Sequence, residues 1–263
     1  MKMQTISSIV WIFISIHLFH SPCLFAEENK KSKISIEATQ NDNEDLKKIW
    51  RRNQIENEAR LLVKQERYEE AISKFREATN PSILNHDYEA STARGLIRDL
   101  LVLQGNFDQA LSEFRYVINR NPNKEDWIDE KMEIEALIKA RDTGSKEPIY
   151  QHIRYLKEKY KKYLPPLGYR GDFSPIVTTP IIRLYDYIGD YGGGITFVDE
   201  ILKYFASGKA GDPNKKGKAD YAYQAVREAF EEEKREGFKG CLGKSSCVGR
   251  ATKALIQSDY FPW

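Results

Sequence analysis

Two stretches of the chain carry one pattern, Tyr68-Glu69-Glu70-Ala71-Ile72-Ser73-Lys74-Phe75 and Phe107-Asp108-Gln109-Ala110-Leu111-Ser112-Glu113-Phe114. Each stretch begins with an aromatic residue; an alanine lies three positions after that aromatic residue, and a phenylalanine lies seven positions after it. These spacings place the side chains on one face of an α-helix. Alanine lets a second helix approach closely, and phenylalanine fills the space beside it. The pattern therefore predicts paired helices that pack closely at Ala71 and Ala110.

A second helix precedes each stretch, so the expected unit is an antiparallel helix pair. In the first copy, Ile55, Ala59 and Leu62 share one helical face. The sequence Lys64-Gln65-Glu66-Arg67 then forms the turn. In the second copy the turn contains Gly105, which adopts backbone conformations that other residues resist. Pro122 is expected to stop the helix that follows.

These copies resemble the tetratricopeptide repeat family, and the whole chain resembles an exported bacterial member of it. The matching residues are Tyr68, Ala71, Ile72, Phe75 and Ala78 in the first copy, and Gly105, Phe107, Ala110, Leu111, Phe114 and Pro122 in the second. Two further helix pairs are expected, over residues 127–140 with 147–163 and over residues 175–207. Aligning Ala71, Ala110, Ile149 and Gly194 gives steps of 39, 39 and 45 residues. The family's period is about 34 residues, so these copies are elongated.

One helix pair cannot bury its apolar face alone, so the pairs must stack on one another. The expected fold is all-α, an α-solenoid of antiparallel helix pairs over residues 46–207 with a C-terminal capping helix. The resemblance implies a partner-binding groove along the first helix of each pair. Its candidate residues are Asn53, Glu56, Arg60, Thr92 and Asp99. Some proteins of this family clamp a terminal carboxylate with Lys and Asn, but Glu56 stands where that lysine is needed.

Residues 208–263 are expected to form C-terminal capping helices with a disulfide loop. A helix over residues 218–236 has one apolar face and an opposite charged face, Glu231-Glu232-Glu233-Lys234-Arg235. Cys241 and Cys247 are predicted to form a disulfide, since no second cysteine pair or nearby histidine completes a metal site. A short helix over residues 248–257 is expected to fold back on the last helix pair. Its aromatic tail would then cover the open end of the array.

The N-terminus has the layout of a secretory signal peptide. Lys2 is the only charge before Glu27, and an apolar run covers residues 9–19. We expect cleavage after Ala26, a flexible polar leader over residues 27–45, and a periplasmic or secreted chain without a transmembrane span. One alternative is a permanent anchor, although the run is shorter than the roughly 20 residues that span a bilayer. The other is lipidation of Cys23, whose surroundings resemble a lipoprotein signal only loosely.

The composition and the remaining motifs argue against several kinds of site. Positive and negative charges are balanced, at 41 and 39 residues, whereas nucleic-acid binding needs a concentrated basic face. His86 and His152 have no marked partners for a triad or a zinc site, and we expect neither metal nor cofactor. Gly192-Gly193-Gly194 lacks the Lys-Ser/Thr of a phosphate loop and is expected to be a loop or a helix start.

Two further segments are each open to two interpretations, an ordinary surface segment or a binding site. Arg170-Gly171-Asp172 resembles integrin-binding loops, but a match of three residues often arises by chance. The basic segment of residues 209–218 is expected to be a solvated loop. Its alternative is peripheral association with anionic lipid.

The expected function is protein or peptide binding, as an adaptor or scaffold in the bacterial cell envelope, without catalysis. One alternative is an outer-membrane lipoprotein assembly factor, which requires lipidation at Cys23. A second alternative is a hydrolase with a site in residues 168–263. That alternative requires an acid–base constellation, which the sequence does not mark.

Overall fold

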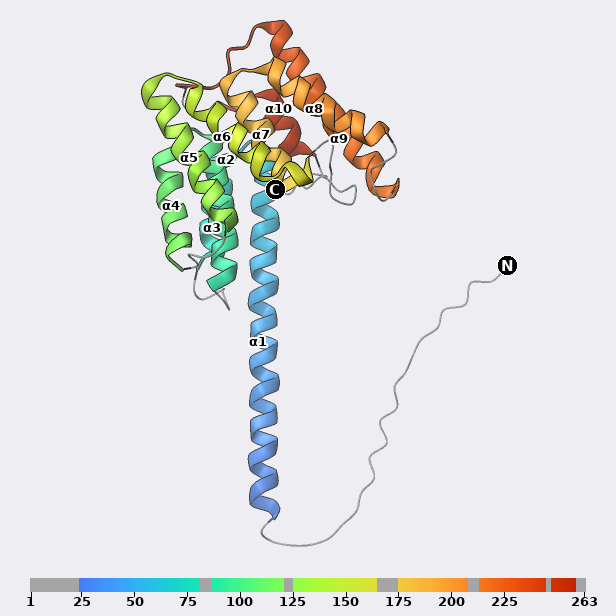
Figure 1. Ribbon diagram of the computed structural model, residues 1–263. Helices are drawn as coiled ribbons and strands as arrows, with labels where there is room; N and C mark the ends of the chain where they lie inside the picture. The colour runs from blue at the N-terminus through green and yellow to red at the C-terminus, as the bar shows by residue number, and fades with distance from the viewer. Residues whose placement is uncertain are drawn as a thin grey trace, which may run out of the picture. The chain divides into compact units, whose positions relative to one another are not determined.

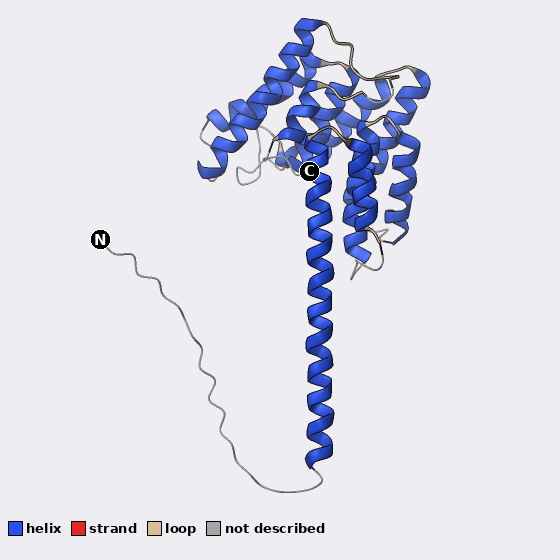
Figure 2. Cartoon of the chain, turned by 180° about the vertical axis from the view of Figure 1, so that it is seen from behind, coloured by secondary structure: helices blue, strands red, loops and turns tan. Residues whose placement is uncertain are grey.

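The computed structural model describes residues 24–80, 87–120, 125–164, 175–207, 213–244 and 247–258. All regular secondary structure in these ranges is helical (Figure 1, Figure 2). The chain divides into two units, residues 1–47 and residues 48–263, and the packed helices belong to the second. Several features of the sequence analysis lie outside the described residues: the predicted signal peptide up to Cys23, His86, Pro122, the Arg170-Gly171-Asp172 tripeptide and the aromatic tail of residues 259–263.

The elements follow one another as a series of helices. They are α1 (Leu24–Lys64), α2 (Tyr68–Ala78), α3 (Asp87–Leu103), α4 (Phe107–Arg120), α5 (Glu125–Thr143), α6 (Glu147–Lys159), the 3-10 helix η1 (Lys161–Tyr163), α7 (Pro175–Ile188), α8 (Tyr191–Ala206), α9 (Pro213–Glu236) and α10 (Arg250–Gln257).

Short turns join the two helices of each predicted pair. Residues 65–67 join α1 to α2, and the corresponding turns of the next three pairs are residues 104–106, 144–146 and 189–190. Three of these turns contain a glycine in the left-handed conformation, with φ angles of 73° at Gly105, 66° at Gly144 and 67° at Gly189. Glu66 adopts the same conformation in the first turn, at φ 61°. One backbone solution thus recurs in all four pairs.

The helices pack mainly on their neighbours in sequence, from α2 on α3 through to α9 on α10. The four aligned positions lie in this core: Ala71, Ala110 and Ile149 have no exposed surface, and Gly194 is buried. A Cβ on Gly194 would lie 2.7 Å from the Phe230 ring, so α8 and α9 approach closely there. Nearest-neighbour packing of helix pairs is the arrangement of a solenoid. The described chain is therefore an all-α, solenoid-like fold, as predicted.

Three local predictions need correction. The expected flexible leader, residues 27–45, lies within α1; no glycine or proline interrupts the sequence from Leu24 to Lys64, so the helix continues. The basic segment of residues 209–218 is helical from Pro213, because proline suits the first turn of a helix. Glu233 was assigned to the charged face of α9, but its side chain is buried against α7 and α10.

The run Gly192-Gly193-Gly194, predicted to be either a loop or a helix start, lies at the start of a helix. Residues 192–194 form the first turn of α8. The carboxylate of Asp190 accepts a hydrogen bond from the Gly193 amide at 3.0 Å and so caps this helix.

The C-terminal segment, defined as residues 239–244 and 247–257, turns back onto the array. Helix α10 packs against α9 and α7 (Figure 1), and Cys241 is disulfide-bonded to Cys247, both as predicted. The Cys241 amide donates to the Tyr187 carbonyl at 2.7 Å, which fixes the loop to α7. Lys253 of α10 also reaches Glu66 in the first turn, at 2.7 Å. The segment therefore contacts both early and late parts of the packed chain.

Candidate functional site

Charged side chains from three first helices meet in one row. The ion-pair row consists of Arg98 and Asp99 of α3, Glu130 and Glu133 of α5, and Arg183 of α7. Arg98 donates to Asp99 at 2.8 Å and also to Glu130. Arg183 donates to Glu133 at 2.5 Å. The row thus ties α3 to α5 and α5 to α7.

Burial is uneven along the ion-pair row. The side chains of Arg98, Glu133 and Arg183 are only 6–13% exposed, whereas those of Asp99 and Glu130 are 26% and 36% exposed. A buried guanidinium is tolerated only when carboxylates satisfy it, so Arg98 and Arg183 hold the row together. The part of the row that faces solvent is acidic.

The pKa of Glu130 is shifted by its surroundings in the row. Burial raises its pKa to about 7, and the charges of Asp99 and Glu133 act in the same direction, while Arg98 opposes them. Its carboxyl therefore changes charge near neutral pH. At neutral pH it is able both to accept and to donate a hydrogen bond.

A second polar centre lies beside the row, at Asp129 of α5. Its buried carboxylate accepts hydrogen bonds from Tyr155 at 2.8 Å, from Lys159 at 2.8 Å and from Tyr160. Burial alone would raise the pKa of Asp129, but bonds from Lys159, Tyr160 and Tyr155 outweigh it and hold the pKa below its usual range. This centre fixes α6 and the following turn onto α5.

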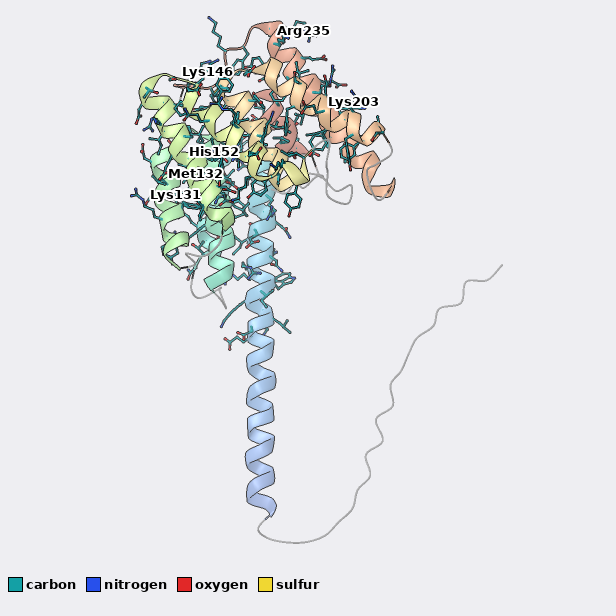
Figure 3. All side chains as sticks on the ribbon, viewed as in Figure 1. Lys131, Met132, Lys146, His152, Lys203 and Arg235 are labelled. Atoms are coloured by element: carbon teal, nitrogen blue, oxygen red, sulfur yellow. A yellow bond between two sulfur atoms is a disulfide. The ribbon has the colours of Figure 1, made fainter. Side chains whose placement is uncertain are left out.

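His152 is an interface residue between α5 and α6, labelled in Figure 3. It is 4% exposed and stacks on Tyr155, with ring centroids 5.9 Å apart. Burial lowers its pKa, although the carboxylates of Glu133 and Asp129 oppose this shift. The ring is therefore neutral at physiological pH.

The predicted groove residues are distributed over two first helices, and only Asp99 belongs to the ion-pair row. On α1, Arg52 donates to Asn53 at 3.3 Å and pairs with Glu56 at 3.5 Å. Arg60 is half-buried on the same helix. The Thr92 side chain lies outside the described residues.

Sequence reasoning missed the other four members of the row. One signal was present: Arg183 stands in the run Ile181-Ile182-Arg183-Leu184, within a helix that is otherwise almost entirely uncharged. A charge amid apolar neighbours predicts a buried, paired side chain. Glu130 and Glu133 carry a weaker signal, since their spacing only places two acids on one face of α5.

The C-terminal segment borders the ion-pair row. Glu133 and Arg183 line a small cleft together with Val248, Gly249 and Thr252 of this segment. The space inside is about 20 Å³, enough for one or two water molecules but not for a ligand. The segment thus closes this end of the row.

Two buried carboxyl groups hold the start of α10. Asp186 of α7 accepts hydrogen bonds from the Thr252 amide at 2.8 Å and the Thr252 hydroxyl at 2.6 Å. Glu233 of α9 accepts from the Arg250 amide at 2.6 Å. A Cβ on Gly249 would lie 2.0 Å from the Asp186 carboxylate. The first turn of α10 is thus capped by side chains of two other helices.

The raised pKa values of these two carboxyl groups indicate that they share one proton. Burial raises the pKa of Asp186, and burial together with the Asp186 charge raises the pKa of Glu233 to about 8. Asp186 Oδ1 and Glu233 Oε2 are both buried, and no donor of the described residues hydrogen-bonds to either atom. Because two adjacent carboxylates cannot both ionise cheaply, a protonated Glu233 donates to an ionised Asp186.

Comparisons with protein-family models, curated proteins and solved structures gave no match. Within the described ranges, no three His, Cys, Asp or Glu side chains form a group that holds a metal ion. No described helix is long and apolar enough to cross a membrane. The fold and site define an all-α, solenoid-like protein with a row of ion pairs across three first helices.

Proposed function

We propose that this chain is an exported, tetratricopeptide-like protein that binds a protein or peptide partner along its first helices. The ion-pair row carries this proposal. The buried Arg98 holds Asp99 on its own helix and Glu130 on the neighbouring helix, while both carboxyl groups keep contact with solvent. Acceptors fixed in this way lose little freedom on binding. They match a partner segment that carries Lys or Arg.

The disulfide supports a location outside the cytoplasm. Cys241 and Cys247 are bonded, which fits a protein that folds outside a reducing cytoplasm. Cleavage after Ala26 remains the expected route of export. The intact mass of the purified chain tests it: a full-length cytosolic product contradicts export, and added acyl mass supports the lipoprotein alternative.

Affinity purification from cross-linked envelope fractions tests the binding function. The wild-type chain is expected to retain one stoichiometric protein partner. The double variant Asp99→Asn, Glu130→Gln is expected to lose it, because the charge of Asp99 and the ionised form of Glu130 are both removed. Because Arg98 loses both of its carboxylate partners in this variant, thermal unfolding is measured first, and only a folded variant is compared with the wild type.

The matched control is Glu135→Gln, which removes an exposed carboxylate of α5 that pairs with Lys131 at 3.4 Å. This variant is expected to keep the partner. Equal retention of the partner by all three proteins would show that the ion-pair row is not the binding site.

A further inference from the structure

Helix α1 presents two different faces between residues 48 and 64. One face enters the core through Ile55, Ala59 and Val63, which are at most 6% exposed. The opposite face carries Trp50 and Leu61, which are 67% and 57% exposed. Both large apolar side chains lie on the same face, so this face is suited to contact with a second helix.

The exposed face has the spacing of a helix-pairing seam. Trp50, Gln54, Asn57 and Leu61 are separated by four, three and four residues. At about 100° per residue they lie within an arc of roughly 60°. Gln54 and Asn57 are exposed like the two apolar residues. We call these four residues the α1 seam.

The order of residues in the α1 seam is the same in both directions: apolar, amide, amide, apolar. An antiparallel pair centred between residues 55 and 56 places Trp50 against Leu61 of a second copy. It also places Gln54 against Asn57 of that copy, where the two amides hydrogen-bond and set the register. A two-fold axis repeats each contact, as an isologous dimer requires.

Charge complementarity favours the same arrangement. Arg51 and Glu58 flank the seam at equivalent positions, each next to one of its residues. In an antiparallel pair, Arg51 of one copy lies near Glu58 of the other, and the two-fold axis forms this contact twice. Glu58 pairs with Lys74 through Oε2 at 3.1 Å, and its side chain is still 53% exposed. Both charges are therefore accessible to a second copy.

From this self-complementary seam, we propose that two copies of the chain associate through antiparallel pairing of α1 over Trp50–Leu61. The proposal is independent of partner binding at the ion-pair row. The seam covers only about three helical turns, which is small against a standard interface of roughly 1,600 Å². The association is therefore concentration-dependent.

Sedimentation equilibrium over a concentration series tests the proposal. The wild-type chain is expected to form dimers, and Trp50→Ala with Leu61→Ala is expected to abolish them. Tyr221→Ala is the matched control, because it removes a 77% exposed aromatic side chain of α9 outside the seam. A chain that stays monomeric at all concentrations, or a dimer that survives the double substitution, overturns the proposal.

Charge exchange tests the pairing. Arg51→Glu and Glu58→Arg are each expected to weaken the dimer, and the double variant is expected to restore it. Failure of the double variant to recover association contradicts the Arg51–Glu58 contact.

Cysteine cross-linking tests the orientation, in a Cys23→Ser background with the Cys241–Cys247 bond intact. A mixture of the Gln54→Cys and Asn57→Cys chains is expected to cross-link more efficiently than either chain alone. Efficient cross-linking of each chain alone, without gain in the mixture, indicates parallel pairing and refutes the antiparallel seam.

Discussion

Substitution of Glu233 by glutamine is expected to change how stability depends on pH. The folded state keeps a proton on Glu233 up to a pKa of about 8, whereas the unfolded chain releases it near the ordinary value of 4.5. A raised folded pKa contributes stability that is complete below the unfolded pKa and is lost as pH rises through the folded pKa. The wild-type protein therefore loses stability between these two values.

The size of this loss follows from the linkage of one proton. Where the folded state binds one proton more than the unfolded state, the free energy of unfolding falls by about 1.4 kcal/mol per pH unit. Two units, from about pH 5.5 to about pH 7.5, give a contribution of roughly 3 kcal/mol. In Glu233→Gln, the amide donates permanently to Asp186 and its carbonyl accepts from the Arg250 amide, so this contribution is absent.

Urea unfolding at several pH values measures the effect, and the useful quantity is the difference between variant and wild type. This difference removes contributions of other titrating groups such as Glu130. Glu231→Gln is the control, because its carboxylate is 46% exposed and pairs with Arg227 on the surface of α9. Identical pH slopes for wild type and Glu233→Gln would refute the shared proton.

Three further predictions concern packing. Ala110→Leu is expected to overpack the fully buried position between paired helices and to cost about 1–3 kcal/mol, measured as a lower denaturant midpoint; an unchanged midpoint would contradict the close packing. Gly249→Ala is expected to lower the melting temperature, because the new Cβ would lie 2.0 Å from the Asp186 carboxylate. Gly95→Ala, in the middle of α3 with no atom within 4 Å of the new Cβ, is expected to stabilise the protein by about 0.5–1 kcal/mol. Equal effects of the two substitutions would contradict this distinction. Deletion of residues 258–263 is expected to lower the melting temperature if the tail caps the array, while unchanged stability with lost partner binding would identify it as a docking peptide.

The sequence was sufficient for the parts of the fold that follow from local patterns. Apolar periodicity and the glycine at position 105 located the helix pairs, since both features act within a few residues. The disulfide was predictable because Cys241 and Cys247 are the only cysteines after the leader. The helical state of residues 27–45 was missed, because a polar composition says little about helix formation when no glycine or proline intervenes.

The candidate site was harder to predict, because it depends on contacts between helices. Asp99 was identified through its place on a first helix, but its arginine partner forms a bridge to Glu130, 32 residues away from Arg98. Glu233 resembles its neighbours in an acidic run of the sequence. Its raised pKa depends on burial and on Asp186, which lies on another helix. Hydrophobic patterning assigns charged residues to the surface and cannot identify the few that are buried as pairs.

Helix α7 connects the ion-pair row with the buried Asp186–Glu233 pair. Arg183 and Asp186 lie about one turn apart on this helix. Arg183 extends to α5 and completes the ion-pair row, whereas Asp186 extends to α10 and holds the C-terminal segment. Each would be costly alone in an apolar helix, and each is satisfied by a partner from a different part of the chain. The position of α7 thus fixes both the proposed binding face and the segment that borders it.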